Sequence, residues 1–164
     1  GDEGDGWKVT VSALANERSS IGEVTQMFGK LDTLKELVKK TNIQGQPAAK
    51  DPRVRRTIAM FEAKIAAMKY NGLRYLTKQL KGEPLTSETS VNKLHRASLE
   101  IEMDDFAVAL TGQAGLQLRG GDEAVDGGSW AKASLNWPNV VIGGGTPNIQ
   151  RNIIAERILG LPKD

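Results

Sequence analysis

The chain has no cysteine among its 164 residues, and it contains no long uninterrupted hydrophobic run. Without thiols it can form neither a disulfide nor a zinc–thiolate site, and the composition is compatible with a reducing compartment. No apolar segment approaches the roughly 20 residues that a membrane-spanning helix needs, and the first residues do not resemble a signal peptide. We therefore expect a cytoplasmic protein without a membrane span.

A strong excess of charge of one sign is also missing. Lys and Arg number 22 and Asp and Glu number 20, so the formal net charge is +2 with the one histidine neutral. A domain that binds the phosphates of nucleic acid usually carries a larger positive excess. We therefore expect no nucleic-acid partner. The scarcity of histidine and the lack of cysteine also lead us to expect no metal site.

What the chain does have is hydrophobic residues at helical spacing. The first stripe predicts a helix whose apolar face is interrupted once, at Glu17. Asp51 as N-cap and Pro52 at the first helical position predict the start of a second helix, which continues to Leu80. Gly45 and Pro47 predict a loop between the two helices. The apolar residues of the first stripe are Trp7, Val11, Leu14, Ile21, Val24, Phe28, Leu31, Leu34 and Val38.

The second half of the chain continues the helical pattern. A third helix is expected over 91–110, after possible caps at Thr86, Ser87 and Thr89, and a short one over 130–135. Thr146 as N-cap, Pro147 at the first position and Gly160 as terminator delimit a last helix. No strand is expected, because the run Val140 to Ile142 is too short. The sequence therefore predicts an all-α domain, an antiparallel four-helix bundle.

Glu17 lies on the face that Leu14 and Ile21 define, where a carboxylate is out of pattern. A buried, unpaired carboxylate is unfavourable unless a partner or a raised pKa compensates for the loss of water. One interpretation is therefore a desolvated general base that removes a proton from a substrate. The other is structural: Arg18 or another basic residue pairs with Glu17, or water reaches this level of the helix.

Two further features could bind an anion. Gly143, Gly144 and Gly145 precede the last helix, and backbone N–H groups in such a turn can approach a phosphate closely. The alternative is a flexible connector followed by a well-formed cap. A basic cluster at the start of the second helix is either a solvated face or a phosphate grip, and it consists of Arg53, Arg55 and Arg56.

Two terminal motifs resemble the C-terminal helical domain of acyl-CoA dehydrogenases. The string GGGTPNIQRNIIAERILGLP at 143–162 is similar to the C-terminal signature of that family, and GWKVTVSALANERSSIG at 6–22 resembles the start of its C-terminal domain. The order of elements between them also agrees, so the resemblance spans nearly the whole chain. It is closest to a diverged branch common in actinobacteria, some of whose members act on bulky or steroid-derived thioesters.

The resemblance implies that residues 1–164 are the C-terminal helical bundle of a longer flavoprotein, which would also have an N-terminal helical domain and a middle β domain. FAD would be the cofactor, and the bundle of one subunit would reach the adenosine and pyrophosphate of its neighbour's FAD. The implied reaction oxidises an acyl-CoA thioester to the 2,3-enoyl-CoA. The implied partners are the acyl-CoA substrate, an electron-transfer acceptor and further subunits in a homo- or hetero-oligomer, a dimer or tetramer.

The resemblance also implies where the catalytic base lies. Most members take a glutamate from the loop before the last helix, but the matching residue here is Gly144, which cannot act as a base. A minority place the glutamate on the first helix of this domain, immediately before an arginine. The matching residues here are Glu17 and Arg18, so the carboxylate that breaks the apolar pattern coincides with the family's alternative base.

The resemblance also implies that Gly145, Thr146 and Asn148, in the glycine-rich entry to the last helix, contact the flavin. Gly112 matches a glycine in the stretch that faces the partner's FAD. The chain departs from the family where a loop with an Arg-x-x-Phe-Gly motif usually follows the first helix, because Thr41 to Pro47 contains neither Arg nor Phe. Arg55 is the candidate that could replace the missing phosphate contact.

The departures from the family pattern leave other hypotheses open. The chain could be a non-catalytic partner subunit that only completes a mixed oligomer of acyl-CoA dehydrogenases. It could belong to a relative that binds DNA, although the near-neutral charge argues against this. It could also be a helical scaffold without a flavin.

Overall fold

The computed structural model describes residues 2–17, 21–83 and 87–163, without the side chains of residues 11, 12, 14–17, 21 and 22. This part of the chain is mainly helical, which confirms the predicted all-α class. Short 3-10 turns and a π-helical turn, Ile154–Ile158, connect or extend the helices. The main elements are α1 (Gly6–Glu17), α2 (Ile21–Lys40), β1 (Asn42–Ile43), β2 (Gln46–Pro47), α3 (Pro52–Leu80), α4 (Thr89–Thr111), α5 (Ser129–Leu135), α6 (Trp137–Ile142) and α7 (Pro147–Ile153).

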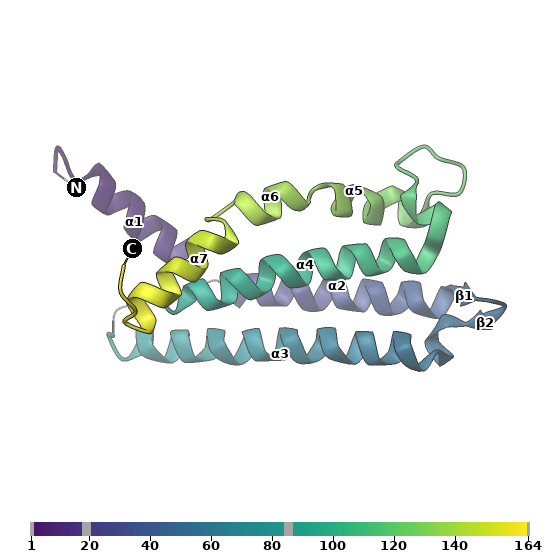
Figure 1. Cartoon of the computed structure of the whole chain (residues 1–164), viewed down its shortest axis with the longest axis horizontal. Helices are drawn as coiled ribbons and strands as arrows, with labels where there is room; N and C mark the ends of the chain where they lie inside the picture. The colour runs from purple at the N-terminus through teal and green to yellow at the C-terminus, as the bar shows by residue number, and fades with distance from the viewer. Residues whose placement is uncertain (1, 18–20, 84–86, 164) are drawn as a thin grey trace.

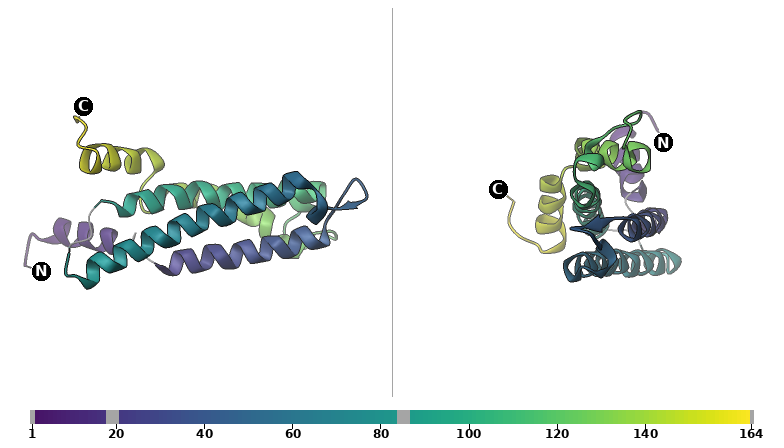
Figure 2. Two further views of the ribbon diagram at one scale, coloured as in Figure 1. Left: turned by 90° about the horizontal axis from the view of Figure 1, so that it is seen from below. Right: turned by 90° about the vertical axis from the view of Figure 1, so that its right-hand side faces the viewer.

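The three long helices α2, α3 and α4 lie side by side and run antiparallel to their neighbours in the chain (Figure 1). The short helices α5 and α6 run back along α4, so they take the place of the fourth helix of the predicted bundle. Seen end-on in Figure 2, α7 lies to one side of the long helices. No helix in the described ranges is both long enough and apolar enough to cross a lipid bilayer.

Local start signals place two helices as predicted. The Asp51 carboxylate accepts a hydrogen bond from the Arg53 backbone N–H at 2.7 Å, and Pro52 opens α3. Thr146 Oγ1 accepts a longer one, 3.4 Å, from the Ile149 N–H at the start of α7. Both caps satisfy backbone donors that the first helical turn leaves without partners.

The predicted cap of α4 is wrong. Glu88 occupies the N-cap position and makes no side-chain cap hydrogen bond, while Thr86 lies outside the described residues. Tertiary contacts fix Glu88 instead. Its carboxylate pairs with Lys78 at 2.7 Å, and its carbonyl oxygen accepts a hydrogen bond from the Tyr75 hydroxyl at 2.7 Å. Contacts between helices, rather than a local cap, therefore set the start of α4.

The first predicted helix is two helices in the structure. Helix α1 extends beyond the bundle at the end where α7 lies, and α2 alone joins the bundle (Figure 1). Trp7 was expected either in the core or at a subunit contact, and it is not in the core of this chain, because it is 80% exposed. Val9 on the same helix is exposed as well. The described side chains of α1 thus lack the covering surface that their apolar pattern requires.

Two short elements also differ from the predictions. The loop around Gly45 is a tight hairpin in which Asn42 pairs with Pro47 and Ile43 with Gln46. Its two turn residues, Gln44 and Gly45, both have positive φ, as a two-residue hairpin turn of the primed type requires. The run from Val140 to Ile142 is not a strand, as expected, but it is the end of α6, a helix that was not predicted.

The core lies along the seam between α2, α3 and α4. The fully buried Leu31 and Leu34 come from α2, Ile65 from α3, and Leu99 and Met103 from α4. Every one of these side chains is at most 1% exposed. Their close packing holds the three helices in one fixed arrangement.

The apolar stripe of α3 leaves the core near its C-terminal end. In the sequence, Leu73 and Leu80 continue the helical apolar spacing and are expected on the buried face, but both are exposed. Gly72 and Tyr75 face the interior at this level instead. The predicted stripe is therefore wrong here, because the small Gly72 and the hydrogen-bonded Tyr75 occupy the inner face of the helix.

Charged residues cross the seam between α2 and α4. Lys30 Nζ lies 2.7 Å from Asp104 Oδ2 and 3.7 Å from Glu100 Oε1. Arg96 pairs with Glu23 and also approaches Glu100, with 3.5 Å between Nε and Oε2. Burial raises the pKa of Asp104, and the hydrogen bond and charge of Lys30 oppose that rise. The buried carboxylate thus depends on Lys30 for compensation.

Replacing Lys30 by Met should destabilise the chain in a pH-dependent way. At pH 7 the loss should be about 3 kcal/mol, because the buried Asp104 carboxylate would keep its charge without its cation. A folded-state pKa above the unfolded value means that the free energy of unfolding falls as pH rises through that pKa. The deficit of Lys30→Met should therefore grow as the pH rises from the ordinary carboxyl range toward neutrality, as measured by urea unfolding.

The matched control for this prediction is Lys39→Met. Lys39 forms an ion pair with Glu36 at 2.6 Å on the exposed side of α2, where water screens the charges. It should lower the free energy of unfolding much less and with little pH dependence. Equal losses in the two variants at every pH would contradict the role given to Lys30.

Candidate functional site

The residues predicted to bind FAD lie in two groups at opposite ends of the bundle. Gly145, Thr146 and Asn148 are together at the start of α7. Gly112 ends α4 and Arg55 lies in the first turn of α3, both at the end that carries the β1–β2 hairpin (Figure 1). Lys93 of α4 lies beside the first group, where it packs against Gly144. Between Lys93 and Gly112 the α4 helix rises about 28 Å, at 1.5 Å per residue.

The first group includes the glycine-rich turn, residues 143–145. Gly144 and Gly145 have φ of 69° and 100°, which a residue with a Cβ rarely adopts. The Gly145 N–H donates to the Ile142 carbonyl at 3.0 Å. The backbone N–H groups of Gly144 and Thr146 have no acceptor among the described residues. Such a turn presents two donors to a ligand that carries acceptor atoms.

A polar cleft of about 330 Å³ lies beside this turn. Two cations and two carboxylates line it, so the cleft has no net charge from these side chains. Within the described ranges no group of three His, Asp or Glu residues is placed to hold a metal ion. The lining residues are Glu23, Lys93, Arg96, Glu100, Asn136, Asn139, Val140, Gly143 and Gly144.

Gly144 takes the position at which most proteins of the resembled family carry the catalytic glutamate. The position is not empty space, because a Cβ built there would lie 3.2 Å from Cε of Lys93. Helix α7 is also short, seven residues before the π-helical turn. The dipole of so short a helix contributes little to anion binding. The backbone N–H groups of the glycine-rich turn are therefore the main donors to a ligand.

The predicted catalytic pair is only partly covered by the structure. Glu17 is the last residue of α1, and its side chain is not among those described. Arg18 lies outside the described residues. Helix α1 nevertheless extends from the same end of the bundle as α7 (Figure 1). The catalytic role of Glu17 and Arg18 thus stays a prediction.

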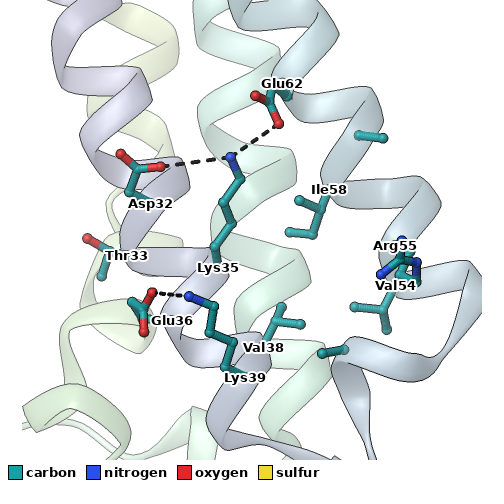
Figure 3. Close-up of a pocket in the computed structure, with 12 residues that line it drawn as sticks. Asp32, Thr33, Lys35, Glu36, Val38, Lys39, Val54, Arg55, Ile58 and Glu62 are labelled. Carbon is teal, nitrogen blue, oxygen red and sulfur yellow. Dashed lines mark hydrogen bonds and ion pairs between the residues drawn. The ribbon is translucent and has the colours of Figure 1, made fainter.

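Arg55 of the second group borders a groove of about 740 Å³ between α2 and α3, which Gly112 does not line. Figure 3 shows an apolar floor that includes Val38, Val54 and Ile58. Lys35 on its rim pairs with Glu62 at 3.1 Å. Arg55 is exposed and makes no ion pair with another described residue. The groove therefore combines an apolar surface with an unpaired guanidinium, which suits a ligand that has a flat apolar part and a phosphate.

The other members of the basic cluster do not share this role. Arg53 pairs with its own N-cap residue Asp51, at 2.9 Å between Nη2 and Oδ2, and its side chain is 87% exposed. Arg56 is exposed and does not line the groove. For Arg53 the solvated-face interpretation holds.

Sequence reasoning missed two polar residues that contact the backbone around the glycine-rich turn. Gln150 is 1% exposed and Lys93 is 9% exposed. Helical spacing in the sequence gives a weak signal that both side chains are buried. Gln150 stands three and four residues before Ile153 and Ile154, on the apolar face of the last helix, and Lys93 stands four residues before the buried Ala97.

Comparison with known families agrees with this arrangement. The family model described as "Acyl-CoA dehydrogenase, C-terminal domain" matches residues 4–159. The chain is 33% identical over 166 residues to acyl-CoA dehydrogenase IpdE1 of Mycolicibacterium smegmatis, covering 100% of this chain and 39% of that protein. It is 31% identical to IpdE1 of Mycobacterium tuberculosis, covering 100% of this chain and 40% of that protein. The chain thus spans about two fifths of these relatives.

Solved structures share the fold. The ChsE4–ChsE5 complex from Mycobacterium tuberculosis superposes with a TM-score of 0.81 at 24% identity, over 100% of this chain and 43% of that chain. The Tcur3481–Tcur3483 steroid ACAD gives 0.81 at 23% identity, over 100% and 42%. Butyryl-CoA dehydrogenase from Megasphaera elsdenii gives 0.76 at 21%, over 97% and 40%. The helical bundle and its two terminal motifs are those of the C-terminal domain of acyl-CoA dehydrogenases, and the chain belongs to that family.

Proposed function

We propose that the chain is the C-terminal bundle of an FAD-dependent acyl-CoA dehydrogenase, which oxidises an acyl-CoA thioester to the 2,3-enoyl-CoA. The observation that carries the proposal is the separation of the predicted cofactor-binding residues into two groups at opposite ends of one helical bundle. A subunit that contacts its own flavin at one end and a neighbour's flavin at the other needs this arrangement. Bound FAD would accept the hydride that leaves the substrate's β-carbon.

At the α7 end, the glycine-rich turn fits a cofactor or thioester with acceptor atoms. The N–H groups of Gly144 and Thr146 are available, and no Cβ at 144 or 145 blocks approach to the backbone. Asn148 in the first turn of α7 adds an exposed polar side chain. We assign Gly145, Thr146 and Asn148 to flavin binding on this basis.

At the hairpin end, Arg55 and Gly112 would meet the FAD of a partner subunit. The groove beside Arg55 offers apolar contacts for an adenosine group, and the guanidinium would bind its pyrophosphate. Gly112 has a φ of 61° and open space where a Cβ would stand, so a ligand can approach the backbone there. Arg55 would thereby replace the arginine that the hairpin loop lacks.

The base in this proposal is Glu17, with Arg18 as its electrostatic partner. The interruption of the apolar face at Glu17 supports it, together with the glycine at position 144. A carboxylate that removes an α-proton needs a pKa near neutrality, which partial desolvation provides. A cytoplasmic location and a separate electron-transfer acceptor complete the proposal.

A second candidate is a non-catalytic partner subunit of a mixed oligomer. The absence of the family's Arg-x-x-Phe-Gly motif from the hairpin loop favours it. Two of the structures with the same fold are also named as pairs of proteins, ChsE4–ChsE5 and Tcur3481–Tcur3483. In this version the mixed oligomer, and not this subunit, acts on the acyl-CoA, and the name of the second pair suggests a steroid-derived acyl group. One flavin per two chains in the purified assembly would favour this candidate.

Replacing Glu17 by Gln in the complete protein should lower turnover of its acyl-CoA by at least about 100-fold, because the amide cannot accept the α-proton. FAD content should not change. The rate of flavin bleaching by acyl-CoA is the measurement. Glu102→Gln, which changes an exposed carboxylate on α4 outside both candidate sites, is the matched control and should behave like the wild type. Unchanged turnover in Glu17→Gln would remove Glu17 from the mechanism.

Replacing Arg55 by Ala in the complete protein should weaken FAD binding about tenfold, through loss of a charge-assisted hydrogen bond to phosphate. Flavin retained on gel filtration at a range of protein concentrations measures the effect. Arg74→Ala is the control, since Arg74 is exposed near the opposite end of α3. Equal flavin retention in both variants would refute the role of Arg55.

A further inference from the structure

The glycine-rich turn is held by a buried amide from α7. Gln150 Nε2 donates to the Gly144 carbonyl at 2.9 Å and approaches the Gly145 carbonyl at 3.4 Å. Both partners can only accept hydrogen bonds, so the nitrogen of the amide must face them. Because the side chain of Gln150 is 1% exposed, water cannot easily replace it as the donor.

A second buried side chain reaches the segment before the turn from α4. Lys93 Nζ donates to the Val140 carbonyl at 2.9 Å, in the last turn of α6. The aliphatic part of the same side chain packs against Gly144, with Cε 3.2 Å from the position of a Cβ there. The turn is thus fixed from two helices that are far apart in sequence.

These contacts decide which backbone groups the turn presents. Three consecutive glycines have more conformational freedom than any other tripeptide, and ordering them is correspondingly unfavourable. Gln150 binds the carbonyl oxygens of Gly144 and Gly145 on the buried side. The N–H groups of Gly144 and Thr146 are left without acceptors among the described residues. Without Gln150 the turn would sample conformations in which those donors point elsewhere.

We infer that Gln150, assisted by Lys93, is a positioning residue for the reaction. It orients the backbone donors of the glycine-rich turn toward the flavin and thioester. The inference rests on the proposed function for its catalytic meaning, while the ordering of the turn by Gln150 stands on the contacts alone. Gln150 and Lys93 do not themselves react, so replacing Gln150 should change the affinity for the substrate and the mobility of the turn.

The test uses the complete, flavin-loaded protein and three variants. Gln150→Met keeps the size of the side chain and removes the donor. Gln150→Glu retains a donor only while the carboxyl group is protonated. Gln79→Met, at an exposed position of α3, is the matched control. Hydrogen exchange of the peptide that contains residues 143–149 and steady-state kinetics are measured on each, with octanoyl-CoA and a steroid-side-chain acyl-CoA as probes.

We expect hydrogen exchange in the turn of Gln150→Met to be about tenfold faster than in the wild type, because two partly buried carbonyls lose their donor. KM for the acyl-CoA that the wild type accepts should rise about tenfold, with a smaller change in kcat, because fewer molecules hold the competent turn. In Gln150→Glu both effects should be strong at pH 8 and should diminish toward pH 6, as the protonated carboxyl recovers a hydrogen bond to Gly144. Gln79→Met should match the wild type throughout.

Several outcomes would overturn the inference. Wild-type exchange rates in the turn of Gln150→Met would show that Gln150 does not order it. Faster exchange with an unchanged KM would remove the positioning role. Identical pH profiles for the Met and Glu variants would exclude the hydrogen bond as the cause. A wild-type protein that neither probe reduces would instead count against the proposed function, and the exchange data would still decide whether Gln150 orders the turn.

Discussion

The close packing of α2, α3 and α4 along one buried seam is the constraint on which the rest of the structure depends. Leu34, Ile65 and Met103 are fully buried where these helices meet, and the Lys30–Asp104 pair joins α2 to α4 within the same seam. An apolar seam alone tolerates sliding of one helix along another. A buried ion pair opposes sliding, since any shift would separate two charges that have little access to water.

A seam of this kind turns the bundle into a rigid spacer. One end carries the glycine-rich turn and the other carries the β1–β2 hairpin with Arg55, so neither group can move toward the other. In the proposed enzyme this rigidity has a purpose, because each end would serve a different flavin. The contacts of Gln150 make the turn rigid as well. Its buried side chain holds in place a segment that three glycines alone would leave flexible.

Local signals in the sequence predicted a large part of this fold. The caps at Asp51 and Thr146 depend on neighbouring residues alone, and both helices begin where expected. The exposure of Leu73 could not be predicted, because periodicity identifies a face of a helix but not its neighbour. The burial of Gln150 had only a weak signal, its spacing from Ile153 and Ile154. Residues of the candidate site were found through family motifs. The contact of Lys93 with the Val140 carbonyl joins distant segments of the chain, which no local pattern reports.

The central claim is that the two ends of one bundle contact two different flavins. A structure of the complete, FAD-loaded assembly tests it most directly. The account predicts one flavin within hydrogen-bonding distance of the backbone at Thr146 and a second one, bound mainly by a partner subunit, within reach of Arg55. Both groups on the same flavin, or no flavin at either end, would contradict it.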